Sequence, residues 1–291
     1  MSSQNKVVVI TGASTGIGYL TAELLAKNNF QVVATMRDAE NSNKENAESL
    51  SSLSSNISIE ELDVSNCQSV NSAIKNTIDK FNQIDVIVNN AGIMNVGLAE
   101  GFTIEQLNHQ MNVNYIGVAR LFREALPYMK PKKTGLFITV SSIVGRIIFP
   151  FLSTYNPSKF AVEALAEIYR YELSPFNIDS VIVEPGPFST NLIDNSPHPE
   201  DEERLKDYGE LANAAEKTMQ GFQEFMKDNP DCDPNLVSNA ILDLINMEYG
   251  ERPVRTVSGM DYGVKEINAF TEKYQIGVME QMGLKNLMPN K

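Results

Sequence analysis

The stretch that decides the fold reads Lys6-Val7-Val8-Val9-Ile10-Thr11-Gly12-Ala13-Ser14-Thr15-Gly16-Ile17-Gly18. Its first half, Lys6–Thr11, is rich in β-branched residues and predicts a short buried strand. Glycines then follow at G-x-x-x-G-x-G spacing, and a helical pattern of apolar residues continues to about Asn28. Strand, glycine turn and helix form a dinucleotide-phosphate site, because glycines admit a pyrophosphate and a helix N-terminus offers free N–H groups. The spacing is not the usual G-x-G-x-x-G, and a plain tight turn is the alternative.

The alternation of strand and helix continues along the chain. Short apolar runs predict further strands at Gln31–Thr35, Ile57–Leu62, Ile84–Val88, Gly135–Ser141, Ile178–Val183 and Val254–Val257. Helical spacing predicts helices over Ile104–Met129, 153–174, Leu236–Met247 and Tyr262–Leu284, one ending near Phe81, and a loose one within Asn41–Ser55. No repeat or linker divides the chain. The sequence therefore predicts an α/β fold, a Rossmann-type, doubly wound, mostly parallel sheet in a single domain over residues 1–291.

Composition excludes several classes of function. Asp+Glu exceed Lys+Arg by 37 − 24 = 13, and this net charge of −13 argues against nucleic acid or an anionic membrane as the main partner. Cys67 and Cys232 are too few for a disulfide framework or a metal cluster, and His109 and His198 lack ligand partners at metal spacing. No apolar run reaches signal-peptide or transmembrane length. We expect a cytoplasmic protein with no bound metal and no membrane insertion.

The end of the second predicted strand distinguishes the two nicotinamide cofactors. It reads Thr35-Met36-Arg37-Asp38. If Met36 is the tip residue, Arg37 follows it. Its guanidinium would then bind the 2′-phosphate of NADP through bidentate, charge-assisted hydrogen bonds. If Asp38 is the relevant residue, its carboxylate accepts from the ribose hydroxyl and selects NAD. Because Arg37 comes first, we favour NADP, with a solvated charge as the alternative for Arg37.

Polar and small residues follow the third and fourth predicted strands. Asp63 precedes Val64 and lies where it could accept from an adenine amino group, or it could cap the next helix. Ser65 and Asn66 are other candidates for that cap. Asn89-Asn90-Ala91-Gly92 follows the fourth strand, and its small residues would let the chain cross close over a flat cofactor. A simple turn is the alternative.

Tyr155 and Lys159 are the candidates for proton transfer. On a helix they lie side by side, one turn apart. A Tyr titrates near pH ~10, and a neighbouring cation favours the phenolate, so we expect Lys159 to lower the pKa of Tyr155 into a useful range. Ser142 lies at the C-terminal end of the fifth strand, where open α/β sheets bind ligands. Asn114 lies within a predicted helix among apolar residues, where a buried amide needs a hydrogen-bond network or a water.

The segments after the sixth strand would close the site. The turn Glu184-Pro185-Gly186-Pro187-Phe188-Ser189-Thr190 redirects the chain. Residues 191–234 break the strand–helix alternation at the ligand edge, which suggests a substrate lid or, alternatively, an ordinary helical cover. Residues 258–291 form a C-terminal helical extension. The apolar residues expected to line a substrate site, or else to pack in the core, are Val96, Ile147, Phe149, Leu152, Phe188, Leu192 and Phe222 or Phe225.

Together these motifs resemble the short-chain dehydrogenase/reductase family over roughly residues 6–190. In that resemblance, Asn114, Ser142, Tyr155 and Lys159 match the catalytic tetrad, and Pro185-Gly186 with Thr190 match the segment that closes over the nicotinamide. The tip of the second strand is similar to NADP-preferring hydroxysteroid and retinol dehydrogenases. The resemblance implies cofactor contacts from Gly12, Ser14, Thr15, Gly16, Ile17, Gly18, Arg37, Asp63, Val64, Asn90, Ala91, Gly92, Tyr155, Lys159, Pro185, Gly186 and Thr190.

The resemblance also implies a reaction. Hydride would pass between NADP(H) and a hydrophobic ketone, aldehyde or secondary alcohol, with Tyr155 as acid or base, Ser142 on the substrate oxygen and Asn114 holding a water that continues the relay from Lys159. The alternatives are an NADP-binding scaffold or redox sensor without turnover, and a lyase or epimerase on the same fold. Copies of the chain would pair through the helices at 104–129 and 153–174 as a homo-oligomer.

Overall fold

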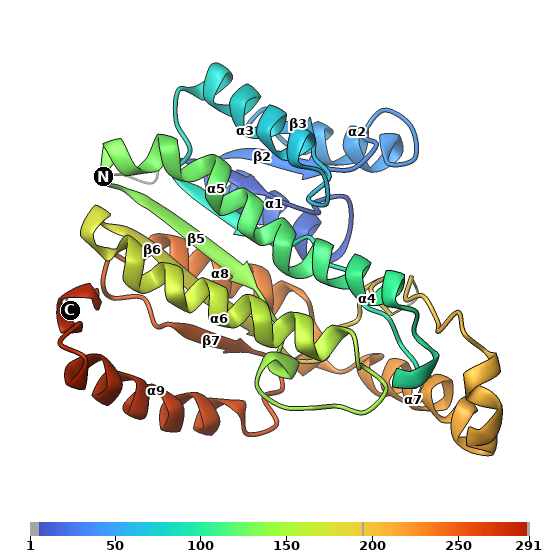
Figure 1. The fold of residues 1–291 in the computed structure, drawn as a ribbon. Coiled ribbons are helices and arrows are strands. Elements are labelled where there is room, and N and C mark those ends of the chain that lie inside the picture. The colour runs from blue at the N-terminus through green and yellow to red at the C-terminus, as the bar shows by residue number, and fades with distance from the viewer. Residues whose placement is uncertain (1–5, 194, 290–291) are drawn as a thin grey trace.

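The sheet is the centre of the molecule. The computed structural model describes residues 6–193 and 195–289. Asp194 of the predicted lid, and residues 1–5 and 290–291 of the predicted domain, lie outside the described residues. The strands are β1 (Val7–Ile10), β2 (Gln31–Met36), β3 (Ile57–Glu61), β4 (Val86–Asn89), β5 (Gly135–Val140), β6 (Ile178–Pro185) and β7 (Arg255–Ser258). They form one seven-stranded sheet in the order β3-β2-β1-β4-β5-β6-β7, and every pairing is parallel (Figure 1).

Strands β1, β4, β5 and β6 are buried along their whole length because both faces of the sheet are covered. Successive side chains of a strand point to opposite faces. Val8 and Ile10 therefore belong to one core cluster, and Val7 and Val9 belong to another. All four are at most 2% exposed. The predicted Rossmann-type, doubly wound α/β fold in a single domain is confirmed.

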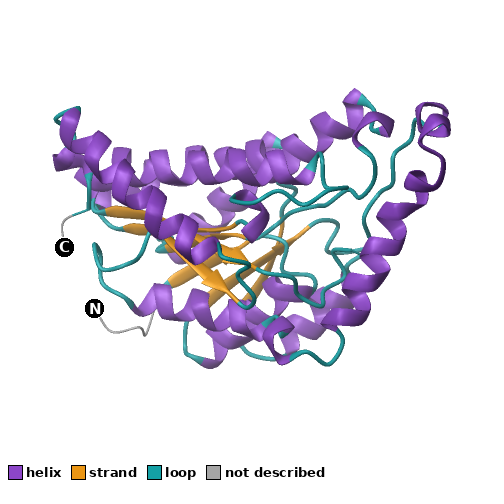
Figure 2. Ribbon diagram, turned by 90° about the horizontal axis from the view of Figure 1, so that it is seen from below, coloured by secondary structure: helices purple, strands orange, loops and turns teal. Residues whose placement is uncertain are grey.

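Helices cover the two faces of the sheet in separate layers (Figure 2). Apolar residues of α1, α2 and α8 pack in the first cluster, and those of α3, α5 and α6 pack in the second. The helices are α1 (Gly16–Lys27), α2 (Lys44–Ser52), α3 (Cys67–Phe81), α4 (Ile104–Met111), α5 (Gly117–Met129), α6 (Tyr155–Leu173), α7 (Ala214–Met226), α8 (Asn235–Asn246) and α9 (Val264–Gln281).

The helix predicted over Ile104–Met129 is interrupted. A π-helical turn, Asn112–Ile116, lies between α4 and α5. Single π-turns inside helices occur often at functional sites, because the extra residue redirects side chains. Here the turn contains Asn114, which the sequence singled out as a polar residue in an apolar helix.

The order of the strands places the ligand edge. The chain leaves β1 first toward β2 and β3 and later toward β4, so the order reverses at β1 and β4. A crevice opens at such a reversal, at the carboxyl ends of the strands. Figure 1 shows α7 and the segment before it beyond the tips of the arrows, at the same end of the sheet.

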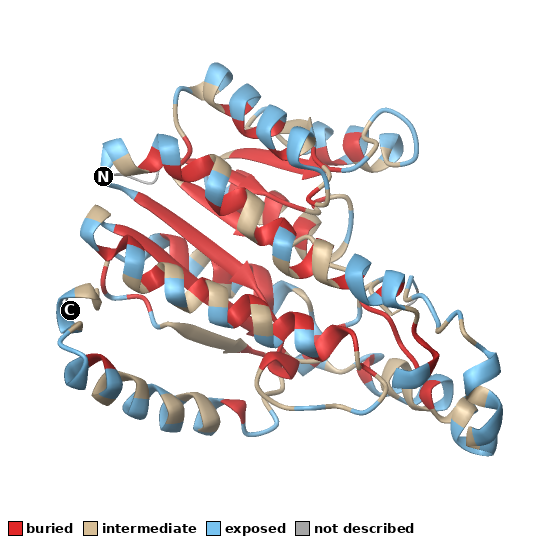
Figure 3. Cartoon of the chain, in the orientation of Figure 1, coloured by how far each residue is buried: buried red, intermediate tan, exposed pale blue. Residues whose placement is uncertain are grey.

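The C-terminal part of the chain forms the edge of the sheet opposite β3. Strand β7 forms the edge next to β6, and α9 follows it. Figure 3 shows the central strands buried, while β7 and much of α9 are only partly buried or exposed. Within the described residues, no helix has the length and apolar character needed to cross a membrane.

Candidate active site

The glycine turn lies against the end of β4. Gly12 has a φ of 67°, in the left-handed region that favours glycine, and an added Cβ would come 2.9 Å from the Cα of Ala91. The Nδ2 of Asn90 donates to the carbonyl of Thr11 at 2.8 Å and of Gly12 at 3.1 Å. Thr15 occupies the N-cap of α1 without a side-chain capping bond. The first N–H groups of α1 are thus left for an anion.

A cleft of about 440 Å³ runs along the carboxyl edge of the sheet. It brings together 16 of the 17 residues for which the sequence predicts cofactor contact: Gly12, Ser14, Thr15, Gly16, Ile17, Arg37, Asp63, Val64, Asn90, Ala91, Gly92, Tyr155, Lys159, Pro185, Gly186 and Thr190. Gly18 does not line it. An added Cβ there would come 2.3 Å from the carbonyl oxygen of Gly12, so Gly18 serves the close packing of α1 on the turn. The sequence missed Asn43, which also lines the cleft.

The two charged residues after β2 point to different places. Arg37 lines the cleft, is exposed, and its guanidinium has no protein partner among the described residues. Asp38 does not line the cleft. Its carboxylate accepts from Asn41 at 2.7 Å and from the hydroxyl and N–H of Ser42 at 2.7 and 3.0 Å. These hydrogen bonds lower the pKa of Asp38 to about 2.

Asp63 lines the cleft and does not cap the next helix. Its Oδ1 accepts from the N–H and the hydroxyl of Ser65 at 2.8 and 2.7 Å. Asn66 is the N-cap of α3, and its side chain accepts from the N–H groups of Gln68 and Ser69. The alternative prediction that Asp63 caps the next helix is therefore wrong. Asn66, one of the two other candidates, is the cap.

Tyr155 and Ser142 come together from different elements. Tyr155 begins α6, and Ser142 follows the end of β5. The two side chains are buried, and both line the cleft. The Ser142 hydroxyl also donates to the carbonyl of Pro185 at 3.3 Å. Burial raises the pKa of the Tyr155 phenol well above its ordinary value, and the nearby Ser142 hydroxyl offsets this only in part.

Lys159 does not produce the lowered pKa of Tyr155 that the sequence predicted. Its ammonium lies over the ring of Tyr155, 5.4 Å from the centroid, and donates to the carbonyl of Val140 at 2.9 Å. Lys159 is 6% exposed, and burial lowers its own pKa to about 8. Desolvation is therefore the largest effect on the pKa of both side chains, and it favours the neutral phenol of Tyr155.

Asn114 is held by the chain around it. Its Oδ1 accepts from the N–H of Ile93 at 2.9 Å, and its Nδ2 donates to the carbonyl of Ile93 at 2.9 Å and to the hydroxyl of Ser158 at 3.0 Å. That hydroxyl donates to the carbonyl of Tyr155 at 2.7 Å. Asn114 does not line the cleft. It links the chain after β4 to the first turn of α6.

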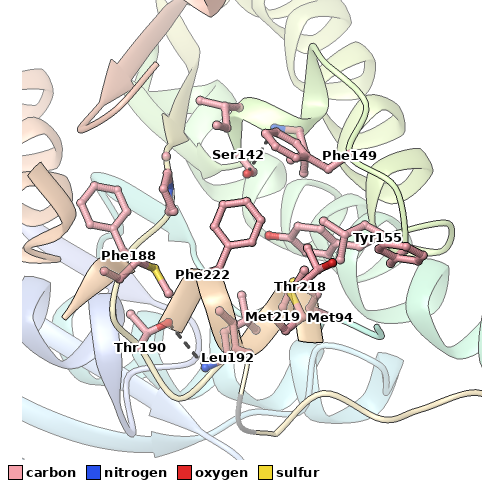
Figure 4. Close-up of a pocket in the computed structure, with 18 of the residues that line it drawn as sticks. Met94, Ser142, Phe149, Tyr155, Phe188, Thr190, Leu192, Thr218, Met219 and Phe222 are labelled. Carbon is pink, nitrogen blue, oxygen red and sulfur yellow. Dashed lines mark hydrogen bonds between the residues drawn. The ribbon is translucent and has the colours of Figure 1, made fainter. Parts of the chain in front are cut away.

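A second, apolar cavity of about 200 Å³ adjoins the cleft. The side chains of Ser142, Tyr155, Phe149 and Phe222 surround it in Figure 4. Leu152, Phe188 and Leu192 line it as predicted, with Met94, Thr218, Met219, Met226 and Tyr262, which the sequence did not single out. Val96 and Ile147 pack in the adjoining cluster without lining the cavity, and Phe225 is 45% exposed.

The segment that precedes α7 is anchored at its start. We call residues 196–208 the strap. The Nε2 of Gln106, which is buried, donates to the carbonyl of His198 in the strap at 2.8 Å. The N–H of Asp201 donates to the carbonyl of Gly101 at 3.0 Å. After the strap comes Gly209, with a φ of 54°, and then α7, which supplies Thr218, Met219 and Phe222 to the cavity.

Known proteins share this sequence and fold. Residues 6–201 match the short chain dehydrogenase family. A 3-ketodihydrosphingosine reductase from Bacteroides thetaiotaomicron is 36% identical over 193 residues, which are 66% of this chain and 67% of the relative. Retinol dehydrogenase 8 from Homo sapiens is 36% identical over 195 residues, 66% of this chain and 62% of the relative.

Solved structures extend the likeness to almost the whole chain. A short-chain dehydrogenase from Streptomyces avermitilis matches with a TM-score of 0.78 and 28% identity, covering 97% of this chain and 98% of that one. ElxO with NADP bound matches with a TM-score of 0.70 and 28% identity, covering 90% and 99%. With its glycine turn, its cleft at the carboxyl edge of a parallel sheet and a match over more than half of its length, the chain belongs to the short-chain dehydrogenase/reductase family of oxidoreductases.

Proposed function

We propose that the protein transfers hydride between NADP(H) and an apolar ketone, aldehyde or secondary alcohol. The observation that carries this proposal is that Tyr155 and Ser142 line both cavities. A group in the apolar cavity and a ring at the end of the cleft would therefore meet at these two hydroxyls. The cavity lining consists mainly of apolar side chains and contains no charged residue among those described, which favours an uncharged, hydrophobic substrate.

The cleft fits a dinucleotide in its chemistry. The N-terminus of α1 and the glycine turn would bind the pyrophosphate, and Asp63 and Val64 would flank the adenine. Lys159 would hold the hydroxyls of the nicotinamide ribose, and Pro185, Gly186 and Thr190 would close over the ring. When bound, the cofactor supplies or accepts the hydride.

The protein's own residues would manage the proton. The raised pKa of Tyr155 keeps the phenol protonated at neutral pH, which is the form that donates to a carbonyl oxygen during reduction. Ser142 would donate a hydrogen bond to the same oxygen and stabilise the charge that develops there. Asn114, bound to Ile93 and Ser158, would fix the first turn of α6 and support a water-linked relay from Lys159.

Arg37 supports NADP rather than NAD. A guanidinium that faces the cleft without a protein partner is suited to a 2′-phosphate. Asp38, the residue that would select NAD, is turned to Asn41 and Ser42 instead. The NADP bound to ElxO agrees with this assignment.

The proposal also covers the cellular location and the oligomeric state of the protein. The net charge of −13 and the two cysteines support a cytoplasmic location. Helices α4 and α6 expose Ile104, Phe160 and Ile168, which supports pairing of two copies through these helices.

Replacing Tyr155 by Phe tests the function. Tyr155→Phe should lower kcat at least about 100-fold, because proton donation is lost, and should leave NADPH affinity within a few-fold. Tyr169→Phe is the control, since this half-buried tyrosine of the same helix stacks on Phe122 at 4.1 Å and lines neither cavity. NADPH oxidation with a panel of apolar ketones and aldehydes measures turnover. Full activity of Tyr155→Phe would refute the acid role, and cofactor binding without turnover by the wild-type protein would favour a scaffold.

A further inference from the structure

A buried carboxylate lies one helical turn beyond Lys159. Glu163 is 2% exposed and shares the face of α6 that carries Lys159, because residues four apart on a helix are neighbours. Its Oε1 accepts from the hydroxyl of Ser141 at 2.8 Å, and its Oε2 accepts from the Nε of Arg255 at 3.0 Å. Gly145 packs directly on it, since an added Cβ there would come 2.3 Å from Oε1. The carboxylate is therefore shielded from water.

The end of β5 holds Lys159 and Glu163 at successive residues. The carbonyl of Val140 accepts from the Lys159 ammonium at 2.9 Å, and the hydroxyl of the next residue, Ser141, donates to Glu163. The pair is thus fixed on α6 by one short stretch of strand. In this dry environment a negative charge acts strongly on a nearby cation.

Other charged groups face Glu163 from the neighbouring elements. Arg255 of β7 also pairs with Glu167 of α6 at 2.7 Å and with Glu184 of β6 at 3.5 Å. Burial, and next the charge of Glu163, raises the pKa of Glu184 to about 8, while Asn268 of α9 and the cations Arg255 and Arg146 oppose this. Arg255 is thus shared among Glu163, Glu167 and Glu184.

We propose that Glu163 is a positioning residue that keeps the buried Lys159 ammonium charged over the ring of Tyr155, with Ser141 and Arg255 holding the carboxylate in place. Through Arg255, the edge strand β7 thereby influences Tyr155 and Lys159 without contacting them. In support, burial lowers the pKa of Lys159, and the charge of Glu163 opposes that shift. The activity readout below rests on the proposed function, whereas the spectroscopic readout does not.

The pH profile of Glu163→Gln tests the proposal, with Glu167→Gln as the matched control. Removing the negative charge lets Lys159 lose its proton more easily, so the alkaline limb of the kcat profile should move to lower pH by about one unit. Glu167 lies one turn farther on and pairs with the same arginine, so Glu167→Gln removes a similar ion pair and should leave the limb in place. A Glu163→Gln profile that superimposes on the wild type would overturn the proposal.

A direct titration of Lys159 separates this inference from the proposed function. The ¹³Cε resonance of Lys159, assigned by its loss in Lys159→Arg, should titrate about one unit lower in Glu163→Gln, measured without cofactor or substrate. The titration is repeated in Glu184→Gln, in which the side chain at position 184 cannot titrate. A midpoint that stays the same in this variant belongs to Lys159 and not to Glu184. An unchanged Lys159 midpoint refutes the proposal even if the enzyme turns over. If Glu163→Gln does not fold, Ser141→Ala should shift the midpoint in the same direction, and no shift would refute the proposal.

Discussion

At the scale of single residues, adjacent side chains of opposite charge take different roles. Arg37 lines the cleft, whereas the carboxylate of Asp38 is engaged by Asn41 and Ser42. The φ of Asp38 is 48°, in the left-handed region that Asp tolerates better than most residues. The turn of the backbone at this residue therefore decides which of the two charges faces the cleft.

Arg37→Ala should weaken the binding of NADPH and leave the binding of NADH nearly unchanged. Loss of the charge-assisted contacts to a 2′-phosphate should raise the KM for NADPH by roughly 10- to 100-fold, because hydrogen bonds to charged groups contribute about 1.5–3 kcal/mol. The KM for NADH should stay within about two-fold. Lys44→Ala is the control, since this exposed cation of α2 does not line the cleft. An equal rise for both cofactors would contradict the assignment of Arg37.

At the scale of elements, α7 is the helix of the predicted lid that reaches the apolar cavity, together with Leu192 at the start of the lid. The strap before it is anchored through Gln106 and Gly101. The ring of Phe222 in α7 meets that of Phe149 edge to face, with centroids 6.1 Å apart. We propose that α7 moves as the lid on its anchored strap, with Gly209 between them.

Phe222→Ala should raise the KM for the substrate and leave the KM for the cofactor unchanged. Loss of the ring removes apolar contact worth about 1.5–3 kcal/mol, which corresponds to at least a ten-fold rise. Phe225→Ala is the control, because Phe225 lies in the same helix but is 45% exposed and outside the cavity. Steady-state kinetics with an apolar ketone provides the measurement. If substrate and cofactor lose affinity equally, α7 is structural cover and not a lid.

At the scale of the whole molecule, a buried ion pair joins elements far apart in the chain. Asp179 near the start of β6 is fully buried and accepts from Arg170 of α6 at 2.7 Å and from Arg252, before β7, at 3.3 Å. Arg252 also donates to the carbonyl of Leu244 in α8 at 2.6 Å. These bonds lie at the amino end of β6, away from the site at its carboxyl end.

Asp179→Ala should destabilise the fold without changing the chemistry. Two buried guanidinium groups would lose their counter-charge, so the free energy of unfolding should fall by about 3–5 kcal/mol. Glu23→Ala removes the surface pair with Lys27 and should cost less than about 1 kcal/mol. Urea denaturation measures both, and kcat of the folded protein should be unchanged. A loss below about 1 kcal/mol for Asp179→Ala would show that the pair does not hold the elements together.

Local patterns in the sequence were sufficient for the fold. The run Lys6–Thr11 and six further runs predict all seven strands. Strand β1 is continuously apolar because it is buried on both faces. The glycine turn is predicted before α1, since glycine favours the left-handed φ of Gly12 and leaves room for Ala91 beside it. The ends of these strands bring Ser142, Tyr155 and Lys159 together at the carboxyl edge, as their positions in the chain indicate.

By itself, the sequence determined the strands, the glycine turn and the residues that meet at the carboxyl edge, because these follow from periodicity and local backbone preference. Only the tertiary structure decided that Asp38 turns away, that a π-turn holds Asn114 and that Tyr155 has a raised pKa. It also joined Glu163 to Arg255, 92 residues away. The physical reason is that burial and charge depend on groups from distant segments, and no local pattern of residues specifies which of them will meet.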